Sequence, residues 1–227
     1  MLFYIIRHGE TNFNIQRIAQ GWIDEPLNEK GRLLARLTGQ GMKEIHFDRC
    51  ISSPLSRAKE TAEIILKENE NSSPNVVSDV EGKPAPCEVA GGLQIETDDR
   101  IKEMHFGIYE GTRLEDNLRK RFFDNPFTFG KFPEGEQVLD VCRRTQKFLK
   151  ELIALDDGKT YLISTHGCAM RAMLNWLYDD PSNFWQDHVP YNCEVAIVEA
   201  KNGIAQLIEK EKIYYDPSYL VDHLTIP

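Results

Sequence analysis

The chain has 227 residues, of which 41% are hydrophobic and 28% charged, a composition typical of a globular protein with one large α/β domain or two small ones. Its formal net charge of −9 argues against nucleic-acid binding, and it contains no apolar stretch of about 18 residues that would span a membrane. A small anionic substrate stays compatible with this charge if positive side chains gather in a pocket. The five cysteines include no Cys-x-x-Cys pair and no signal peptide is visible, so we expect a cytoplasmic protein without disulfides or zinc.

The first predicted element is a buried strand at residues 2–6, which is short, apolar and rich in aromatic and β-branched side chains. It ends in Arg7-His8-Gly9-Glu10, at the carboxyl end of a strand, where open α/β sheets place their ligands. An arginine fork, an imidazole and a glycine that permits close backbone approach suit a phosphate there. The motif alone fits a strand-end salt bridge and a loop-capping histidine equally well.

Two later segments repeat this order of strand, polar residues and helix. A short strand predicted at residues 49–53 leads through a proline into a helix whose first turn contains Arg57. A buried strand at residues 161–164 leads to His166-Gly167, at the start of a helix predicted over residues 168–178. Free N–H groups and the helix dipole favour an anion at such a helix N-terminus.

The remaining segments complete an alternation of strands and helices. Residues 69–92, rich in Asn, Ser, Pro and Gly, are interpreted as a surface excursion rather than a domain linker. The other predicted elements are a helix at residues 28–45, an edge strand at 93–96, a mixed aromatic segment at 98–133 that is expected to cap the carboxyl edge of the sheet, an amphipathic helix at 134–155 and two closing strands at 194–200 and 204–209. This alternation predicts an α/β fold with a largely parallel sheet covered on both faces.

If the three strands are parallel neighbours, the polar groups at their ends converge. The guanidinium groups of Arg7 and Arg57 and the imidazoles of His8 and His166 would then surround one pocket and form a phosphate site. The alternative is four separate surface residues, which the threefold repetition of the pattern disfavours.

The motifs around these residues resemble the histidine phosphatase superfamily, also called the phosphoglycerate mutase-like family. Arg7-His8-Gly9-Glu10, Arg57 after Ser-Ser-Pro and His166-Gly167 after a strand carry the resemblance, and residues 21–27 and 103–107 match it as well. The similarity covers nearly the whole chain in the family's order. It implies a three-layer α/β/α sandwich with a mostly parallel sheet, in a single domain that spans residues 1–227.

The resemblance also implies roles for individual residues. Those that act on the phosphoryl group are the nucleophile His8, the phosphate ligands Arg7, Arg57, His166, Asn14 and Gly167, and the proton donor Glu103. On the substrate side we expect Gln20, Gly21 and His105, although a packing role fits His105 equally well. In mutases of this family a small hydroxyl residue usually stands at the position of Gln20. The glutamine here therefore weakens the case for phosphoglycerate as the substrate.

The residues themselves support the same chemistry. In-line attack on phosphorus requires a neutral His8 nitrogen that faces the phosphate, while the other ring nitrogen donates its proton, with a backbone carbonyl as the expected acceptor. Positive charges would stabilise the equatorial oxygens, and Glu103 would protonate the leaving alkoxide and then accept a proton from water. Because guanidinium groups take the role that magnesium has elsewhere, we expect neither a metal nor another cofactor.

Several residues have weaker claims. Glu110 is an alternative to Glu103 as the proton donor, but we prefer to interpret it as a solvated loop residue. Cys168 is interpreted as a small buried hydrophobe rather than a nucleophile. Four cationic residues would be able to bind an acidic leaving group, but we prefer to interpret them as a solvated helix face: Arg113, Arg119, Lys120 and Arg121.

We therefore expect a phosphomonoesterase that hydrolyses a small phosphorylated metabolite through phospho-His8. A cofactor-dependent phosphoglycerate mutase is the first alternative, but the compact aromatic stretch at residues 122–132 replaces the longer, Arg-rich insertion of mutases and favours water as the acceptor. The second alternative is a non-catalytic phospho-ligand binding protein, which would not need Glu103. The sequence predicts neither the identity of the substrate nor the oligomeric state.

Overall fold

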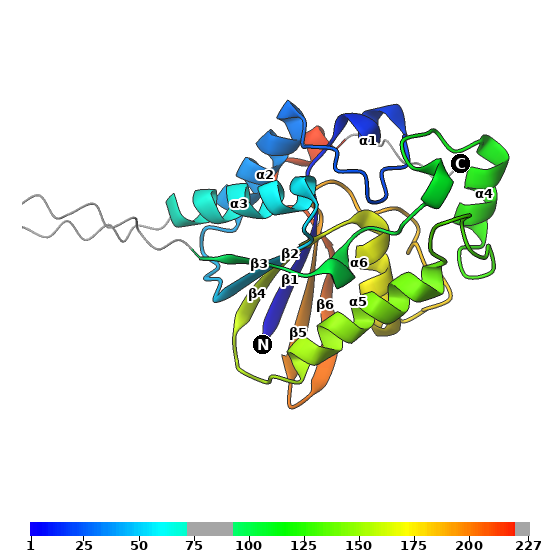
Figure 1. Ribbon diagram of the computed structural model, residues 1–227. Helices are drawn as coiled ribbons and strands as arrows, with labels where there is room; N and C mark the ends of the chain where they lie inside the picture. Colours follow the sequence, from blue (N-terminus) through cyan, green and yellow to red (C-terminus); the bar gives the residue numbers. More distant parts are fainter. Residues whose placement is uncertain (72–92, 221–227) are drawn as a thin grey trace, which may run out of the picture.

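The computed structural model describes residues 1–71 and 93–220, which are built around one six-stranded sheet of order β3-β2-β4-β1-β5-β6 (Figure 1). The strands are β1 (Leu2–Arg7), β2 (Arg49–Ser52), β3 (Ile95–Thr97), β4 (Thr160–Thr165), β5 (Val195–Lys201) and β6 (Ile204–Lys212). Strands β1 to β4 run parallel, whereas β5 is antiparallel to β1 and β6 to β5. The prediction of a mostly parallel sheet is confirmed, with an antiparallel hairpin at one edge.

Helices cover both faces of this sheet and make it the middle of three layers (Figure 1). One face carries α2 (Glu29–Gly41) and α3 (Ser56–Asn71), and the other carries α5 (Val138–Ile153) and α6 (Gly167–Leu174). The predicted three-layer sandwich is therefore confirmed. None of the helices in the described part of the chain is both long and apolar enough to cross a membrane.

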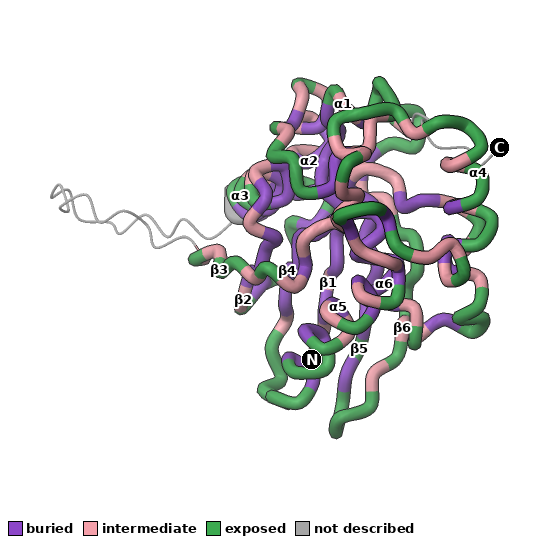
Figure 2. The backbone as a smooth tube through the Cα atoms, turned by 45° about the vertical axis from the view of Figure 1, so that its right-hand side comes forward, coloured by how far each residue is buried: buried purple, intermediate pink, exposed green. Residues whose placement is uncertain are grey.

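Most of the central strand β1 is buried, and most of its tube is purple in Figure 2. Phe3 and Ile5 pack into the core cluster beneath α5 and α6, while Ile6 packs into the cluster beneath α2 and α3. Side chains of a strand alternate between its faces, so a strand covered by helices on both sides must be apolar throughout. This burial explains the uninterrupted apolar run before Arg7.

Some predicted boundaries need correction. The helix predicted at residues 134–155 begins only at Val138, because Glu134 adopts a φ of 57° and a turn precedes the helix. The hairpin at Asn202-Gly203 has positive φ at both positions, as its sequence predicts. The excursion predicted at residues 69–92 lies outside the described residues, apart from its first residues, which continue α3.

Residues 98–133 form η1 (Asp99–Ile101), η2 (Gly107–Tyr109) and α4 (Asp116–Asp124). This segment lies beside α1 (Asn12–Gln16), on the side of the molecule where the parallel strands end (Figure 1). A backbone bridge between Ile18 and Arg113 joins the two regions. Phe122 and Phe132 anchor the segment in a third core cluster, shared with α5 and α6.

Candidate active site

The His8 imidazole, directly after β1, is oriented by the backbone. Its Nδ1 lies 2.7 Å from the carbonyl oxygen of Gly9, so Nδ1 donates its proton there and Nε2 carries the lone pair. Burial, followed by the charges of Arg57 and Arg7, lowers the pKa of His8 well below its usual value. At neutral pH the ring is therefore neutral, with a nucleophilic nitrogen facing away from the backbone.

The backbone at residue 9 passes so close to α2 that only glycine fits there. A Cβ atom at Gly9 would lie 2.6 Å from the carbonyl oxygen of Gly31 in α2. The Gly9 N–H donates to Thr61 Oγ1 on α3 at 2.9 Å. Packing against both helices therefore fixes the carbonyl that orients His8.

His166 follows β4 and occupies the N-cap position of α6, without a capping hydrogen bond from its side chain. Its Nε2 lies 2.8 Å from the Ser53 hydroxyl oxygen, which also accepts a hydrogen bond from Leu55 N–H at 3.4 Å. Because the Ser53 hydroxyl has no other acceptor among the described residues, we assign its proton to the bond with Nε2, which leaves the ring proton of His166 on Nδ1. Burial, followed by the charge of Arg57, lowers the pKa of His166 well below its usual value.

Two buried guanidinium groups reach the same site. Arg57 donates from Nη1 to the carbonyl of Ile23 and from Nη2 to the carbonyl of Gly21, both at 2.8 Å. Arg7 donates from Nη1 to the carbonyl of Pro190. Burial lowers the pKa of both, that of Arg57 to about 10, so each remains charged at neutral pH.

Three buried donors at the site have no acceptor among the residues that the structure describes: Nε of Arg7, Nε of Arg57 and Nδ1 of His166. An unpaired buried donor costs about 1–3 kcal/mol. The His8 and His166 rings lie 5.2 Å apart, and a Cβ at Gly167 would lie 3.5 Å from Arg7 Nε. Fixed positive charges and unpaired N–H groups around one imidazole are the arrangement that stabilises an oxyanion.

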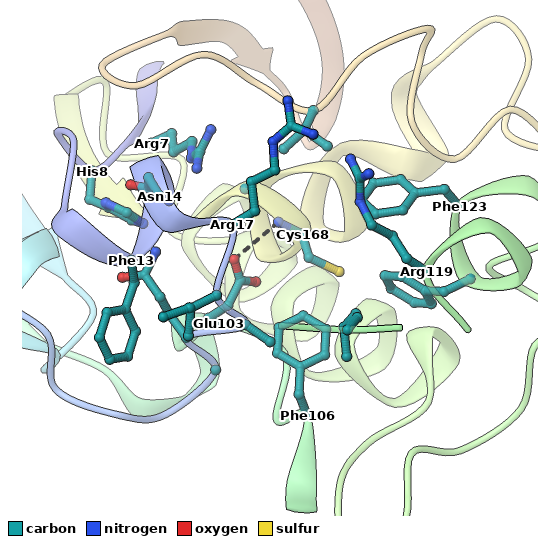
Figure 3. Close-up of a pocket in the computed structure, with 18 of the residues that line it drawn as sticks. Arg7, His8, Phe13, Asn14, Arg17, Glu103, Phe106, Arg119, Phe123 and Cys168 are labelled. Carbon is teal, nitrogen blue, oxygen red and sulfur yellow. Dashed lines mark hydrogen bonds between the residues drawn. The ribbon is translucent and has the colours of Figure 1, made fainter. Parts of the chain in front are cut away.

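A cavity of about 130 Å³ opens at this site (Figure 3). This is about ten times the space that one water molecule needs, so a compact metabolite fits. One wall comes from residues 98–133, the segment expected to act as a cap. The predicted site residues in the lining are Arg7, His8, Asn14, Gln20, Gly21, Arg57, Glu103 and Gly167.

The α1 region is held together by reciprocal hydrogen bonds. The Thr11 hydroxyl accepts from Asn14 N–H, and the Asn14 side chain accepts from Thr11 N–H, both at 3.1 Å. The Thr11 hydroxyl also donates to Gln20 Oε1 at 3.0 Å. Asn192 Nδ2 donates to the carbonyl of His8 at 3.0 Å and to Asn14 Oδ1 at 3.3 Å, which joins this region to His8.

The Glu103 carboxylate lies against the N-terminus of α6. Oε1 accepts hydrogen bonds from the N–H groups of Met104 at 2.8 Å and Ala169 at 3.0 Å. Oε2 accepts only a longer one, from Cys168 N–H at 3.3 Å (dashed in Figure 3). The more lightly bonded Oε2 is therefore the oxygen better suited to carry a proton.

Sequence reasoning missed the residue that holds Glu103 in place. Arg144 on α5 donates to the carbonyl of Glu103 at 2.8 Å and to those of Lys102 and Arg100 at 2.7 and 2.8 Å. Its guanidinium also pairs with Glu136, whose Oε2 accepts from a main-chain N–H at 2.9 Å. The only sequence signal for Arg144 is its position on the polar face of an amphipathic helix. Solvent-exposed residues of a helix give the same signal, so it does not single out Arg144.

The structure also relocates two weaker candidates. His105 does not line the cavity; its ring lies 4.6 Å from that of Trp22 and 3.5 Å from Glu110. Glu110 is not the solvated loop residue expected, since its side chain is 12% exposed and its Oε1 accepts from the N–H groups of Trp22 and Phe106 at 2.9 and 3.1 Å. Glu110 therefore joins two loops, and the substrate-binding role of His105 stays a prediction.

Two alternative chemistries, a cysteine nucleophile and a bound metal ion, find little support among the described residues. Burial raises the pKa of the Cys168 thiol well above its usual value, and Sγ lies 3.8 Å from Met104 Sδ, in keeping with a small buried hydrophobe. Within residues 1–71 and 93–220 there is no group of three or more His, Cys, Asp or Glu side chains that would hold a metal ion. A mechanism without metal stays a prediction.

Comparison with known proteins identifies relatives of the whole fold. The model of the histidine phosphatase superfamily (branch 1) matches residues 3–79 and 85–211. The chain is 29% identical over 202 residues to a probable phosphoglycerate mutase GpmB from Escherichia fergusonii, covering 86% of this chain and 83% of the relative. The residues matched by the family model include the positions of all the predicted site residues.

Two solved structures share the architecture. YhfR from Bacillus stearothermophilus has a TM-score of 0.75 at 28% identity and covers 92% of this chain and 96% of its own. A phosphoglycerate mutase from Bacillus anthracis has a TM-score of 0.73 at 26% identity, with 96% and 94% covered. Both are similar to this chain over nearly its full length.

Proposed function

The chain belongs to the histidine phosphatase superfamily, and on this basis we propose that it is a phosphomonoesterase. It transfers the phosphoryl group of a small phosphorylated metabolite to Nε2 of His8 and then to water. The observation that carries the proposal is the Nδ1–H···O=C bond of His8, which turns a neutral Nε2 away from the backbone beside Arg7 and Arg57.

In the first step the Nε2 lone pair of His8 forms a bond to phosphorus while the P–O bond to the leaving group breaks. The unpaired N–H groups of Arg7, Arg57 and His166 donate to the nonbridging oxygens, whose negative charge the two guanidinium groups balance. Nδ1 keeps its proton and its bond to Gly9, so the phosphohistidine forms without rotation of the ring. Binding also gives acceptors to donors that otherwise lack them.

The leaving oxygen needs a proton, and Glu103 supplies it from Oε2. Oε1 is held by two N–H groups, so the carboxyl keeps its orientation while the proton moves. In the second step a water oxygen bonds to phosphorus, the P–Nε2 bond breaks, and the Glu103 carboxylate accepts a proton from that water. Inorganic phosphate leaves, and His8 and Glu103 return to their initial states.

Phosphoglycerate mutase activity is a second candidate, because the Escherichia fergusonii relative and the Bacillus anthracis structure carry that name. Such an enzyme would form the same phospho-His8, and a substrate hydroxyl would replace water as the acceptor. The two reactions differ only in what reaches phosphorus in the second step.

The deciding experiment incubates the purified protein with a panel of phosphorylated metabolites and with 3-phosphoglycerate. Release of inorganic phosphate supports the phosphatase, whereas isomerisation of 3-phosphoglycerate without net release supports the mutase. We expect an acid-labile phosphohistidine in rapid-quench samples and its loss in His8→Ala. The matched control is His46→Ala, because the His46 side chain is 90% exposed. Turnover by His8→Ala would contradict the proposed nucleophile, and binding without turnover by the parent protein would indicate a non-catalytic binder.

A further inference from the structure

The cavity has a second cationic end, away from His8. Arg17 and Arg119 line it, one at the C-terminus of α1 and the other on α4. In Figure 3 the side chains run from His8 and Arg7 on one side, past Arg17, to Arg119 beside Phe123 on the other. Two segments far apart in the sequence therefore bring guanidinium groups to the same part of the cavity.

Neither guanidinium donates a hydrogen bond or forms an ion pair within the part of the chain that the structure describes. Arg119 lies over the Phe123 ring, with Cζ 5.5 Å from the ring centroid. Neighbouring cationic residues differ: Arg113 donates to the carbonyl of Gln16 at 3.1 Å, and Lys120 pairs with an aspartate one turn further on α4 at 3.2 Å. The interpretation of Arg119 as part of a solvated helix face is therefore wrong, because this side chain is half-buried in the cavity lining.

The electrostatics at this end favour an added anion. Burial and then the charge of Arg17 lower the pKa of Arg119, as does Arg113, and only Asp116 acts in the opposite direction. Arg17 also adopts a left-handed backbone conformation, with φ of 56°, which is uncommon for a residue other than glycine. Arg119 is half-buried and Arg17 is exposed, and an oxyanion that binds between two such like charges stabilises both.

The cavity wall beside Arg119 is largely apolar. On α4 the residues Phe122 and Phe123 follow Arg119 at helical spacing, so all three face the cavity. The remaining apolar lining includes Phe106, Leu114 and Trp185. A ligand that reaches both His8 and Arg119 must therefore be compact and pack against these aromatic side chains.

We propose that Arg17 and Arg119 form a second anion subsite, and that the preferred substrates are phosphomonoesters carrying a carboxylate at the far end of a short apolar or aromatic spacer. This inference rests on the proposed function, since it assigns the phosphoryl group to the His8 end. The guanidinium forks match a carboxylate in geometry, and the aromatic walls cover the spacer.

The test compares para-carboxyphenyl phosphate with para-carbamoylphenyl phosphate, which is matched in shape but uncharged at the far end. The measured quantity is the ratio of their kcat/KM values. We expect this ratio to fall on the order of tenfold in Arg17→Gln and in Arg119→Gln, and to fall in the parent protein as salt is raised. Comparing one ratio between variants cancels the intrinsic reactivity of the two leaving groups.

The matched control is Arg121→Gln, which removes the same charge from an exposed position on α4 outside the cavity lining. It should leave the ratio within about twofold of the parent value, because solvent screens the charge of an exposed side chain. Arg119→Lys keeps the charge and should recover part of the ratio. A ratio that Arg17→Gln and Arg119→Gln leave unchanged would overturn the subsite.

A binding measurement separates this inference from the proposed reaction. In His8→Ala, calorimetry with the non-hydrolysable para-carboxyphenylphosphonate and its carbamoyl analogue gives the same comparison without turnover. Tighter binding of the carboxylate that is lost in Arg119→Gln supports the subsite even if the phosphatase reaction fails. Equal binding of the two phosphonates overturns it even if hydrolysis proceeds as proposed.

Discussion

The hydroxyl of Ser53 lies 2.8 Å from Nε2 of His166, and it joins the ends of β2 and β4 across the candidate active site. With the Ser53 proton assigned to this bond, Ser53 selects the tautomer that leaves His166 Nδ1 as a donor. A residue that directly follows β2 thereby sets the hydrogen-bonding capacity of His166, which directly follows β4.

Ser53→Ala tests this relationship. Without the hydroxyl, the His166 proton can reside on Nε2, and Nδ1 then presents a lone pair to the phosphoryl oxygens. We expect kcat/KM and the affinity for vanadate to fall about tenfold, the loss of one hydrogen bond to a charged group. Ser56→Ala is the control, because the Ser56 hydroxyl has no partner among the described residues. Parent-like vanadate affinity in Ser53→Ala would show that the tautomer is set by other means.

Stability should decrease as the pH falls below about 6.5. The folded protein holds His8 and His166 with pKa values well below the usual 6.5, whereas the unfolded chain has ordinary values, so the unfolded state binds more protons below pH 6.5. Their contribution is complete above pH 6.5 and is lost as the pH falls towards the folded-state pKa values. Each histidine contributes a slope of up to about 1.4 kcal/mol per pH unit.

Urea denaturation at pH 7, 6 and 5 measures this slope. The His8→Gln and His166→Gln variants should each reduce it, because glutamine does not titrate. The exposed His46→Gln is the control and should keep the parent slope. A parent protein with equal stability at the three pH values would contradict the burial of neutral imidazoles.

Arg144→Gln should slow catalysis more than it weakens substrate binding. Arg144 donates to the Glu103 carbonyl from α5 and does not itself line the cavity, so it acts as a positioning residue for the acid. We expect kcat to fall at least about tenfold with KM within about threefold. The free energy of unfolding should fall by about 1–3 kcal/mol, because Glu136 loses its ion-pair partner.

The neighbouring Arg143→Gln is the matched control, since Arg143 is exposed and pairs only locally with Asp140. A purely structural role for Arg144 would lower stability without changing kcat at temperatures where the variant is folded. A slower leaving group should widen the difference between the two variants, because protonation by Glu103 then matters more.

The sequence predicted the parts of the site that sit at strand ends. His8 and His166 each follow a run of apolar residues that predicts a strand. The parallel pairing of β1 with β4 then places the two imidazole rings 5.2 Å apart. The partners of these residues were not predictable: Ser53 contacts His166 across 113 positions of sequence and Arg144 contacts Glu103 across 41. Such contacts depend on the register of the sheet and on the rotation of α5, and neither leaves a local signal.

The last prediction concerns Gly21, whose carbonyl anchors Arg57. Gly21 has a φ of 52°, and a Cβ there would lie 1.9 Å from Glu110 Oε1, the atom that accepts from two loops. Gly21→Ala must therefore displace either Glu110 or the Gly21 carbonyl, and we expect a loss of at least about 2 kcal/mol in the free energy of unfolding together with weaker phosphate binding.

Gly203→Ala separates this clash from backbone strain alone. Gly203 also has a positive φ, of 75°, but a Cβ there meets nothing within 4 Å, so only the conformational cost of about 1 kcal/mol remains. Denaturation and phosphate titration of both variants give the comparison. If Gly21→Ala costs no more than Gly203→Ala and binds phosphate normally, then Glu110 moves freely, and the loop that carries Gly21 does not fix Arg57.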